Sequence, residues 1–296
     1  MKRVDLKCGF SCNNNCKFCV VAHERKLGTR TTEEIKNCLK ESKKTCDEVV
    51  FTGGEVTIRK DILEIVSYAK ELKYKVIQIQ TNGRMFCYED FCKKMIKAGA
   101  NVFALALHGH NSKIHDKLTN AKGAFNQVVK GIKNLKKLNQ NVITNTVVVK
   151  ENYKNLPELA KIFIELKVDQ FQFAFVHALG NAEKNFNEIV PNISEAAKYI
   201  KKGVNIGKNS GIPAMIEGIP YCLLEGYQES ISENVMPDTE INAISYGKVD
   251  FSKQGRLEAK MKFDFCKECK YDNICEGPWK QYPERKGISE FHPIKK

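Results

Sequence analysis

Cysteine spacing near the start of the chain is the sequence feature that most directly indicates chemistry. Cys12, Cys16 and Cys19 stand in the stretch CNNNCKFC with three and then two residues between them. Thiolates bind zinc and iron-sulfur clusters, and three of them can hold three irons of a four-iron cluster while the fourth iron stays open to another molecule. A zinc loop is the alternative interpretation. Cys8 does not fit this spacing and is predicted to be a packing residue.

A second cysteine group lies near the end of the chain. Cys266, Cys269 and Cys275 have two and then five residues between them. Cys222 is the candidate for a fourth ligand, and the other possibility is an iron left open to substrate. A structural zinc held by the three cysteines with Cys222 or His292 is the alternative. The remaining cysteines fall at no ligand spacing and are predicted to pack; they are Cys38, Cys46, Cys87 and Cys92.

The segments between the two groups indicate a parallel α/β fold. Runs rich in β-branched residues predict strands at residues 4–6, 48–52, 76–80, 102–107, 142–149 and 170–176. The longer stretches between them carry apolar residues at helical spacing. These six βα units are fewer than the eight of a full barrel, so we predict a partial (β/α)6 barrel. The first cysteine group follows the first strand, at the edge where such barrels place their functional loops.

After Gly180 the alternation of strands and helices fades. One more helix is predicted from about Ser194 to Lys208, and a loop-rich tail from Gly211 carries the second cysteine group. We expect a barrel domain over residues 1–182, a connecting helical segment over 183–210 and a small auxiliary domain over 211–296. A metal would supply the order that a large core supplies elsewhere.

The first cysteine group, with Phe18 before its last cysteine, resembles the cluster loop of the radical S-adenosylmethionine (radical SAM) superfamily. The sequence FTGGEVT after the second predicted strand resembles the GGE element of that family. In the family this backbone lies beside the methionine part of the cofactor, and the glutamate receives its amino group. The resemblance therefore implies that Gly53, Gly54 and Glu55 bind the cofactor, since glycines permit close approach and a carboxylate suits an ammonium.

Motifs on later strands extend the resemblance over roughly residues 4 to 182. QTNG after the third strand resembles the TNG element of the family, which implies that Thr81 and Asn82 lie near the cofactor. Asn145 on the fifth strand and Gln172 on the sixth are further candidates for cofactor binding. In several relatives the fourth strand presents a serine to the ribose, whereas this chain has Ala106 at that place. The ribose contacts therefore differ.

The tail resembles the auxiliary iron-sulfur domains called SPASM and twitch, although no cysteine follows Cys275. Together the resemblances imply S-adenosylmethionine (SAM), a [4Fe-4S] cluster at the first site and a second [4Fe-4S] cluster in the tail. They imply an oxygen-sensitive enzyme of oxidoreductase, lyase or transferase type, in which SAM is cleaved to a 5'-deoxyadenosyl radical that takes a hydrogen atom from a substrate. A one-electron donor such as flavodoxin or ferredoxin is the implied partner.

Three histidines follow the fourth predicted strand in the stretch HGHNSKIHD. His108, His110 and His115 could reach the mouth of the barrel, where their titration range suits proton transfer. Histidines in loops more often serve as hydrogen-bonding residues, so both roles stay open.

Composition and net charge limit the classes of partner that the chain is expected to bind. The net charge of +13 suggests nucleic acid, yet only seven of the 48 basic residues are arginine, the residue that clamps phosphates with a planar fork. No stretch approaches the roughly 20 apolar residues of a membrane helix, and no signal-peptide core is present. We therefore expect a cytoplasmic protein with no membrane contact.

Three substrate classes remain. A small metabolite or a peptide is favoured, and RNA is the alternative that the charge suggests. The chain begins almost at the first strand, which lowers the expectation of a peptide. A basic module that holds two zinc ions without catalysis is the non-enzymatic alternative, and the GGE element argues against it.

Overall fold

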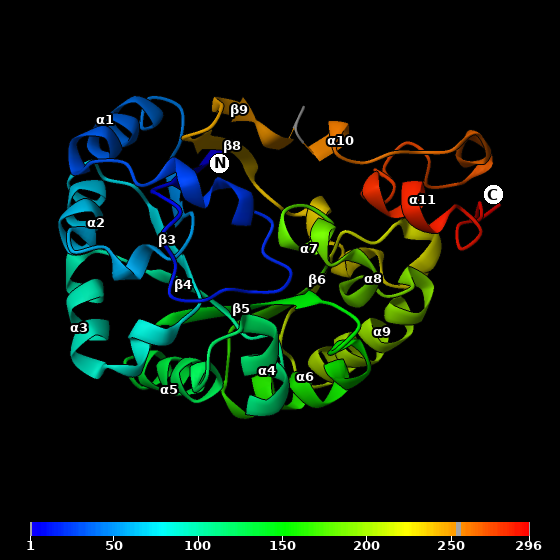
Figure 1. Ribbon diagram of the computed structural model, residues 1–296, viewed down its shortest axis with the longest axis horizontal. Coiled ribbons are helices and arrows are strands. Elements are labelled where there is room, and N and C mark those ends of the chain that lie inside the picture. The colour runs from blue at the N-terminus through cyan, green and yellow to red at the C-terminus, as the bar shows by residue number, and fades with distance from the viewer. Residues whose placement is uncertain (1, 253–255, 296) are drawn as a thin grey trace.

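The computed structural model describes residues 2–252 and 256–295, whose strands form one curved sheet (Figure 1). The strand order is β7-β6-β5-β4-β3-β2-β1-β8-β9. Strands β1 to β8 run parallel, and β9 pairs antiparallel with β8. The strands are β1 (Lys2–Lys7), β2 (Glu48–Thr52), β3 (Val76–Thr81), β4 (Val102–Ala106), β5 (Asn141–Val148), β6 (Gln170–Phe175), β7 (Ala214–Glu217), β8 (Asp238–Ala243) and β9 (Gly247–Asp250).

Helices cover the convex side of this sheet, and Figure 1 shows them following one another around it. The covering helices are α1 (Thr32–Ser42), α2 (Ile62–Glu71), α3 (Glu89–Ala98), α4 (Ser112–Thr119), α5 (Ala124–Lys137), α6 (Leu156–Glu165) and α9 (Ile193–Asn209). Four short helices complete the chain: α7 (Asn181–Lys184), α8 (Phe186–Ile189), α10 (Arg256–Glu258) and α11 (Gln281–Lys286).

Alternation along the strands separates the two faces of the sheet. Phe171 and Phe173 of β6 are fully buried, and each lies against a glycine of α9, where a Cβ would stand 2.7 Å from the ring. Their neighbours in the chain point to the opposite, concave face, because successive side chains of a strand alternate. On that face Gln172 pairs in register with Asn145 of β5, and both side chains are half-buried. The concave face is thus polar, and the convex face is the hydrophobic core.

The structure confirms the predicted partial barrel, and each of the six predicted strands lies within two residues of its observed bounds. It differs from the sequence analysis in the tail, where β7, β8 and β9 extend the same sheet at its two ends. These strands are only four to six residues long and gain their order by pairing with β6 and β1, which a local pattern cannot reveal. The domain division at residues 182 and 210 stays a prediction.

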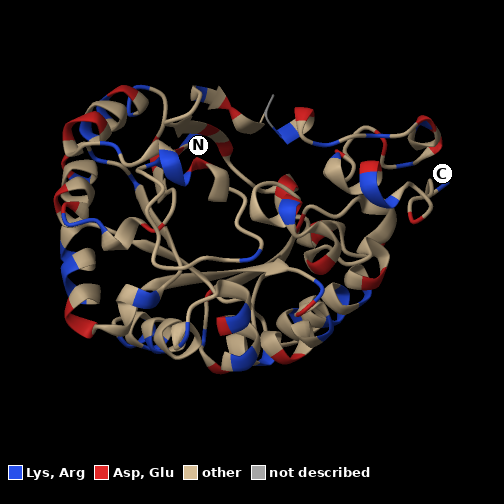
Figure 2. Cartoon of the chain, viewed as in Figure 1, with Lys and Arg blue, Asp and Glu red and all other residues tan. Residues whose placement is uncertain are grey.

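Basic and acidic residues are interspersed along the outer helices (Figure 2). Many basic residues there pair with acidic ones, for example Lys36 with Glu64 at 2.6 Å and Lys136 with Asp169 at 2.5 Å. Within the described ranges no helix has the length and hydropathy that crossing a membrane requires.

Candidate functional site

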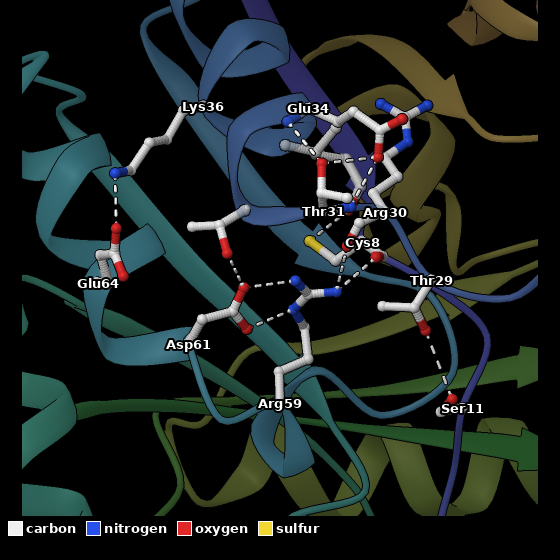
Figure 3. A network of polar contacts seen from close by, with 12 residues as sticks. Cys8, Ser11, Thr29, Arg30, Thr31, Glu34, Lys36, Arg59, Asp61 and Glu64 are labelled. Atoms are coloured by element: carbon white, nitrogen blue, oxygen red, sulfur yellow. Dashed lines mark hydrogen bonds and ion pairs between the residues drawn. The ribbon is translucent and has the colours of Figure 1, made fainter.

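The predicted cluster loop connects β1 to α1, and backbone hydrogen bonds join its two ends. Arg30 N donates to Cys8 O at 3.2 Å, and Phe10 N donates to Gly28 O at 3.0 Å. Arg59 secures both ends of the loop, since its Nη1 donates to Cys8 O at 2.9 Å and to Arg30 O at 3.0 Å (Figure 3). The same guanidinium forms two bonds to Asp61, the residue before α2. Arg59 therefore ties the two ends of the loop to the residues before α2.

Cys12, Cys16 and Cys19 are all half-buried in this loop. Burial, together with the neighbouring thiols of Cys19 and Cys12, raises the pKa of Cys16 to about 12. Burial also raises the pKa of Cys12, while the bond from Asn14 N to its Sγ at 3.4 Å and the charge of Arg25 oppose the rise. A metal would reverse this balance, because coordination deprotonates a thiol outright. The donor set suits an iron-sulfur cluster in its chemistry.

Cys8 lies apart from this group. Its thiol is fully buried and points to Leu6 O at 3.6 Å, back along β1. Burial raises its pKa to about 12, and the charges that act on it are those of arginines and aspartates rather than of the other cysteines. Its place in Figure 3 is in the packed base of the loop, in agreement with the packing role expected for it.

Two of the three asparagines between the first two cysteines, Asn13 and Asn14, accept hydrogen bonds from arginines. Arg84 Nη1 donates to Asn13 O at 2.5 Å and to Asn14 Oδ1 at 2.9 Å. Arg25 Nη2 donates to Asn14 O at 2.9 Å from the other side. Asn82 Nδ2 donates to Asn13 Oδ1 at 2.6 Å. The TNG element and the arginine that follows it thus hold the cluster loop.

Glu55 is the centre of the hydrogen-bond network at the strand ends. Its Oε1 accepts from Thr57 N at 3.0 Å, Thr57 Oγ1 at 2.5 Å and Thr81 Oγ1 at 2.6 Å. Its Oε2 accepts from Asn82 N at 2.6 Å. Because each carboxylate oxygen offers about two lone pairs, Oε1 is saturated and Oε2 can accept one more donor. The free acceptor suits an ammonium group.

The two glycines before Glu55 let the backbones of two loops touch. A Cβ on Gly53 would stand 2.1 Å from Gly9 O, and a Cβ on Gly54 would stand 2.3 Å from Ser11 O. Gly53 also has a φ of +134°, which side chains disfavour. The observed close approach is therefore to the base of the cluster loop, a requirement independent of any cofactor.

The histidines after β4 serve different roles in the fold. His108 and His115 are buried, with stacked rings 5.7 Å apart, and His108 N donates to His115 Nδ1 at 3.0 Å. Val147 N donates to His108 Nδ1 at 3.2 Å, so both Nδ1 atoms are acceptors. Burial lowers the pKa of His108 well below its usual value and that of His115 to about 4. Both rings are neutral at physiological pH and support the loop.

His108 is in contact with Phe18 of the predicted cluster loop. Phe18 is buried, and its ring meets that of His108 edge-on at 4.8 Å. His110 is half-buried and bonds to Asn111 through Nε2 at 2.8 Å, while its Nδ1 is buried with no partner among the described residues. The sequence-predicted histidines therefore divide into two structural rings and one with an unpaired nitrogen.

The remaining candidates lie on the concave face. Ala106, Asn145 and Gln172 stand in one register row across β4, β5 and β6. Asn145 Oδ1 is buried and has no hydrogen-bond partner in the part of the chain that the structure describes. Gln172 Nε2 donates to Glu217 Oε2 of β7 at 2.6 Å. An unpaired acceptor on the concave face is what a cofactor or substrate donor would satisfy.

The second cysteine group lines a small pocket. Cys222, Cys266, Cys269 and Cys275 all line it, and His292 stands in the same wall. Burial, together with the three other thiols, raises the pKa of Cys222 to about 11. The cysteine that lies more than forty positions upstream thus joins the other three. Among the described residues no group of three or more His, Cys, Asp or Glu side chains is arranged around a single metal ion.

Aromatic residues fasten this tail to the barrel. The ring of Trp279 stacks on His177, just after β6, with centroids 4.1 Å apart. Tyr282 packs edge-on against Phe175 of β6 at 5.7 Å. Both residues therefore lie between the tail and the end of β6.

Sequence reasoning missed the residues that hold the site together. Arg84 directly follows the TNG element, and Arg59 comes shortly after the GGE element. The backbone oxygens that they bind, however, lie dozens of positions away along the chain. The proximity of the two arginines to those motifs was the available signal. Glu217 had no signal, because it stands in a strand of four residues.

Comparisons with known proteins agree with this geometry. A family model described as the radical SAM superfamily matches residues 6–163. The chain is 27% identical over 183 residues to an AdoMet-dependent heme synthase of Methanosarcina barkeri, covering 61% of this chain and 52% of that protein. It is 31% identical over 201 residues to a probable GTP 3',8-cyclase of Saccharolobus islandicus, covering 64% and 62%. The chain thus spans between half and two thirds of these relatives.

Solved structures share the fold along nearly the whole chain. Streptococcus suis SuiB bound to S-adenosylmethionine matches with a TM-score of 0.70 at 18% identity, covering 99% of this chain and 76% of that one. The structure of anSMEcpe with bound AdoMet matches with a TM-score of 0.68 at 17% identity, covering 99% and 93%. Because the family model spans more than half of the 296 residues, the chain belongs to the radical SAM superfamily of enzymes.

Proposed function

We propose that this chain holds a [4Fe-4S] cluster on Cys12, Cys16 and Cys19 and uses it to cleave SAM for hydrogen abstraction from a small metabolite or a peptide. Family membership implies SAM and one such cluster. The observation that supports the assignment of residues is that three half-buried cysteines, of which Cys19 and Cys12 act electrostatically on Cys16, share a loop that is hydrogen-bonded to the TNG element. When bound, the reduced cluster supplies the electron that cleaves SAM into methionine and a 5'-deoxyadenosyl radical.

The chain's own residues bind and orient. The free acceptor of Glu55 Oε2 would receive the amino group of SAM, and the adjacent Asn82 and Thr81 fix that carboxylate in place. Gly53 and Gly54 bring this turn against the cluster loop. These roles follow the resemblance, and the observed hydrogen bonds support them.

Further cofactor contacts extend along the barrel mouth. Asn145 Oδ1 offers a second unpaired acceptor to the cofactor. Gln172 stands beside it in the same register row. Phe18, which lies within the cluster loop, packs on His108. His110, with an unpaired ring nitrogen, is the histidine that best fits proton transfer.

The tail would hold a second [4Fe-4S] cluster on Cys222, Cys266, Cys269 and Cys275, as in SPASM and twitch domains. The four thiols share one cavity, which favours four ligands over an open iron. The corresponding division of the chain is a barrel over residues 1–182, a connecting segment over 183–210 and an auxiliary region over 211–296.

The substrate class follows from the relatives only in outline. The names of two curated relatives refer to heme synthesis and to a GTP cyclase, and SuiB has been solved with its precursor peptide SuiA. A small metabolite or peptide is consistent with these, and a one-electron donor such as flavodoxin or ferredoxin completes the reaction. RNA is the alternative, and the mixing of acidic with basic residues on the outer helices gives it little support (Figure 2).

Two measurements test the proposal. Protein purified without oxygen should contain about eight irons and matching sulfide per chain, because two four-iron clusters are assigned. Stoichiometric zinc without sulfide would instead establish the zinc module. Separate addition of small-molecule, peptide and RNA fractions should then raise the 5'-deoxyadenosine yield with one class only, and a response to RNA alone would overturn the substrate assignment.

A further inference from the structure

Glu217 is a carboxylate of the concave face that no motif of the family accounts for. It ends β7, and its register partner on β6 is Ala174, one inward row beyond Gln172. The hydrogen bond from Gln172 Nε2 to Glu217 Oε2, 2.6 Å long, shows that both side chains meet on that face. The end of a parallel strand in such a barrel is where substrate-contacting groups gather. Glu217 therefore stands at the barrel mouth, between the predicted cofactor site and the tail.

The charged side chains around Glu217 form ion pairs with one another. Lys260 lies 2.7 Å from Glu233 and 2.8 Å from Glu276, and Arg256 lies 2.7 Å from Glu276. Two cations thus meet two carboxylates. In the described ranges Glu217 makes no ion pair, and Gln172 is the partner of its carboxylate.

This group of charges is fixed in place. Lys260 is 4% exposed, and the Trp279 ring lies 4.8 Å from its Nζ. Gly218 N donates to Glu233 Oε1 at 2.9 Å, which joins the group to the end of β7. Because buried ion pairs are costly to separate, neither Lys260 nor Arg256 is free to turn to Glu217. Its negative charge is left for a group that enters the barrel.

The electrostatic environment agrees with this geometry. Burial, helped by the charges of Glu233 and Glu276 and opposed by those of Lys260 and Arg256, raises the pKa of Glu217 to about 7. A cation placed beside the carboxylate would lower the pKa again and would recover the free energy that burial costs. An anionic group would be repelled.

We propose that Glu217 and the carboxamide oxygen of Gln172 form the subsite that binds a positively charged nitrogen of the substrate, such as an amine or a protonated ring nitrogen. This inference rests on the proposed function, because it names the chemistry of the molecule that the barrel would take. Glu217 fixes the charged end of that molecule at the tail side of the mouth. The rest of the substrate then extends over β6 and β5 toward the cluster loop, past the unpaired Asn145.

The test compares two probes of one shape on the intact holoprotein with SAM bound. Benzylammonium carries the charge, and benzyl alcohol is its neutral counterpart; binding is measured by calorimetry without oxygen. The parent should bind benzylammonium at one site and at least ~10-fold more tightly than the alcohol, the equivalent of one hydrogen-bonded ion pair. Affinity should rise from pH 6 to pH 8 as Glu217 ionises, while the amine stays protonated throughout.

Variants assign the binding to the site. Glu217→Gln should lose the ~10-fold preference for the ammonium and keep its affinity for the alcohol, whereas Glu229→Gln, an exposed glutamate paired with Lys208, should behave as the parent. Equal binding of the two probes by the parent, or an unchanged preference in Glu217→Gln, overturns the inference. Iron content and SAM cleavage without added amine are measured on the same samples. Failure of cleavage in the parent would count against the proposed function and would leave the binding result to decide this subsite.

Discussion

Glu55 offers the sharpest test of how the site is built, through the substitution Glu55→Gln. The side chain is 2% exposed and accepts four hydrogen bonds. In the variant the amide NH2 must face either Asn82 N or the hydroxyls of Thr57 and Thr81, which are all donors at present. A buried donor left without a partner costs about 1–3 kcal/mol, and the surviving bonds lose the strength that the charge gave them. We expect the free energy of unfolding to fall by about 3 kcal/mol.

The assay is urea unfolding of the anaerobic holoprotein, followed by circular dichroism. Glu64→Gln is the matched control, because the same change is made in a carboxylate that is exposed and pairs only with Lys36 at the surface. That variant should unfold with the parent. The iron of Glu55→Gln should also pass to a chelator faster than that of the control, since Asn82 would no longer hold Asn13. A Glu55→Gln protein as stable as the parent would refute the idea that this carboxylate organises the strand ends.

Three further predictions follow from the cysteines and histidines. Cys222→Ser should alter the electron paramagnetic resonance signal of the second cluster and lower the iron content, and a signal identical to that of the parent would show that Cys222 is no ligand. Cys8→Ala should keep the first cluster and its activity, because its thiol bonds only to Leu6 O; loss of that cluster would contradict its packing role. Burial lowers the pKa of His115 from the ordinary 6.5 to about 4 in the folded protein. The neutral ring therefore contributes fully to the free energy of unfolding above pH 6.5, and this contribution is lost as the pH falls toward 4. The full loss is about 3 kcal/mol. In His115→Asn, unfolding measured between pH 7.5 and 5 should depend less steeply on pH, and an unchanged slope would contradict the neutral buried ring.

The sequence allowed much of the barrel to be predicted because its strands and helices are long and strongly patterned. β2 is buried along its whole length and consists mostly of Val and Phe, and β5 alternates over eight residues. Helix α4 was not expected, since it is eight residues long and lies in a stretch interpreted as a histidine-bearing loop. β7 has four residues and depends on its neighbour β6 for pairing, so its burial pattern is too short to stand out.

The candidate site divides in the same way. Cysteine spacing singled out Cys266, Cys269 and Cys275, and Cys222 was a candidate as the remaining cysteine of the tail; all four line one pocket. The partners of Glu55 were not predictable, since Thr81 and Asn82 reach it only when β2 and β3 are adjacent. Arg59 and Arg84 act on backbone oxygens, which leave no trace in side-chain patterns. The role of Glu217 depends on the ion pairs that the charged residues around it form with one another. Such pairs are visible only in the three-dimensional structure.

The central claim is that the first cysteine group holds the cluster that cleaves SAM. The direct test is to replace Cys12, Cys16 and Cys19 together by alanine and to measure 5'-deoxyadenosine by chromatography after incubation with SAM and dithionite without oxygen. The parent should form the product. The variant should form none, although it should retain about half of the parent's iron in the tail, because the two sites use different residues. Undiminished 5'-deoxyadenosine from the triple variant would contradict the account, since it would place the reaction at another site.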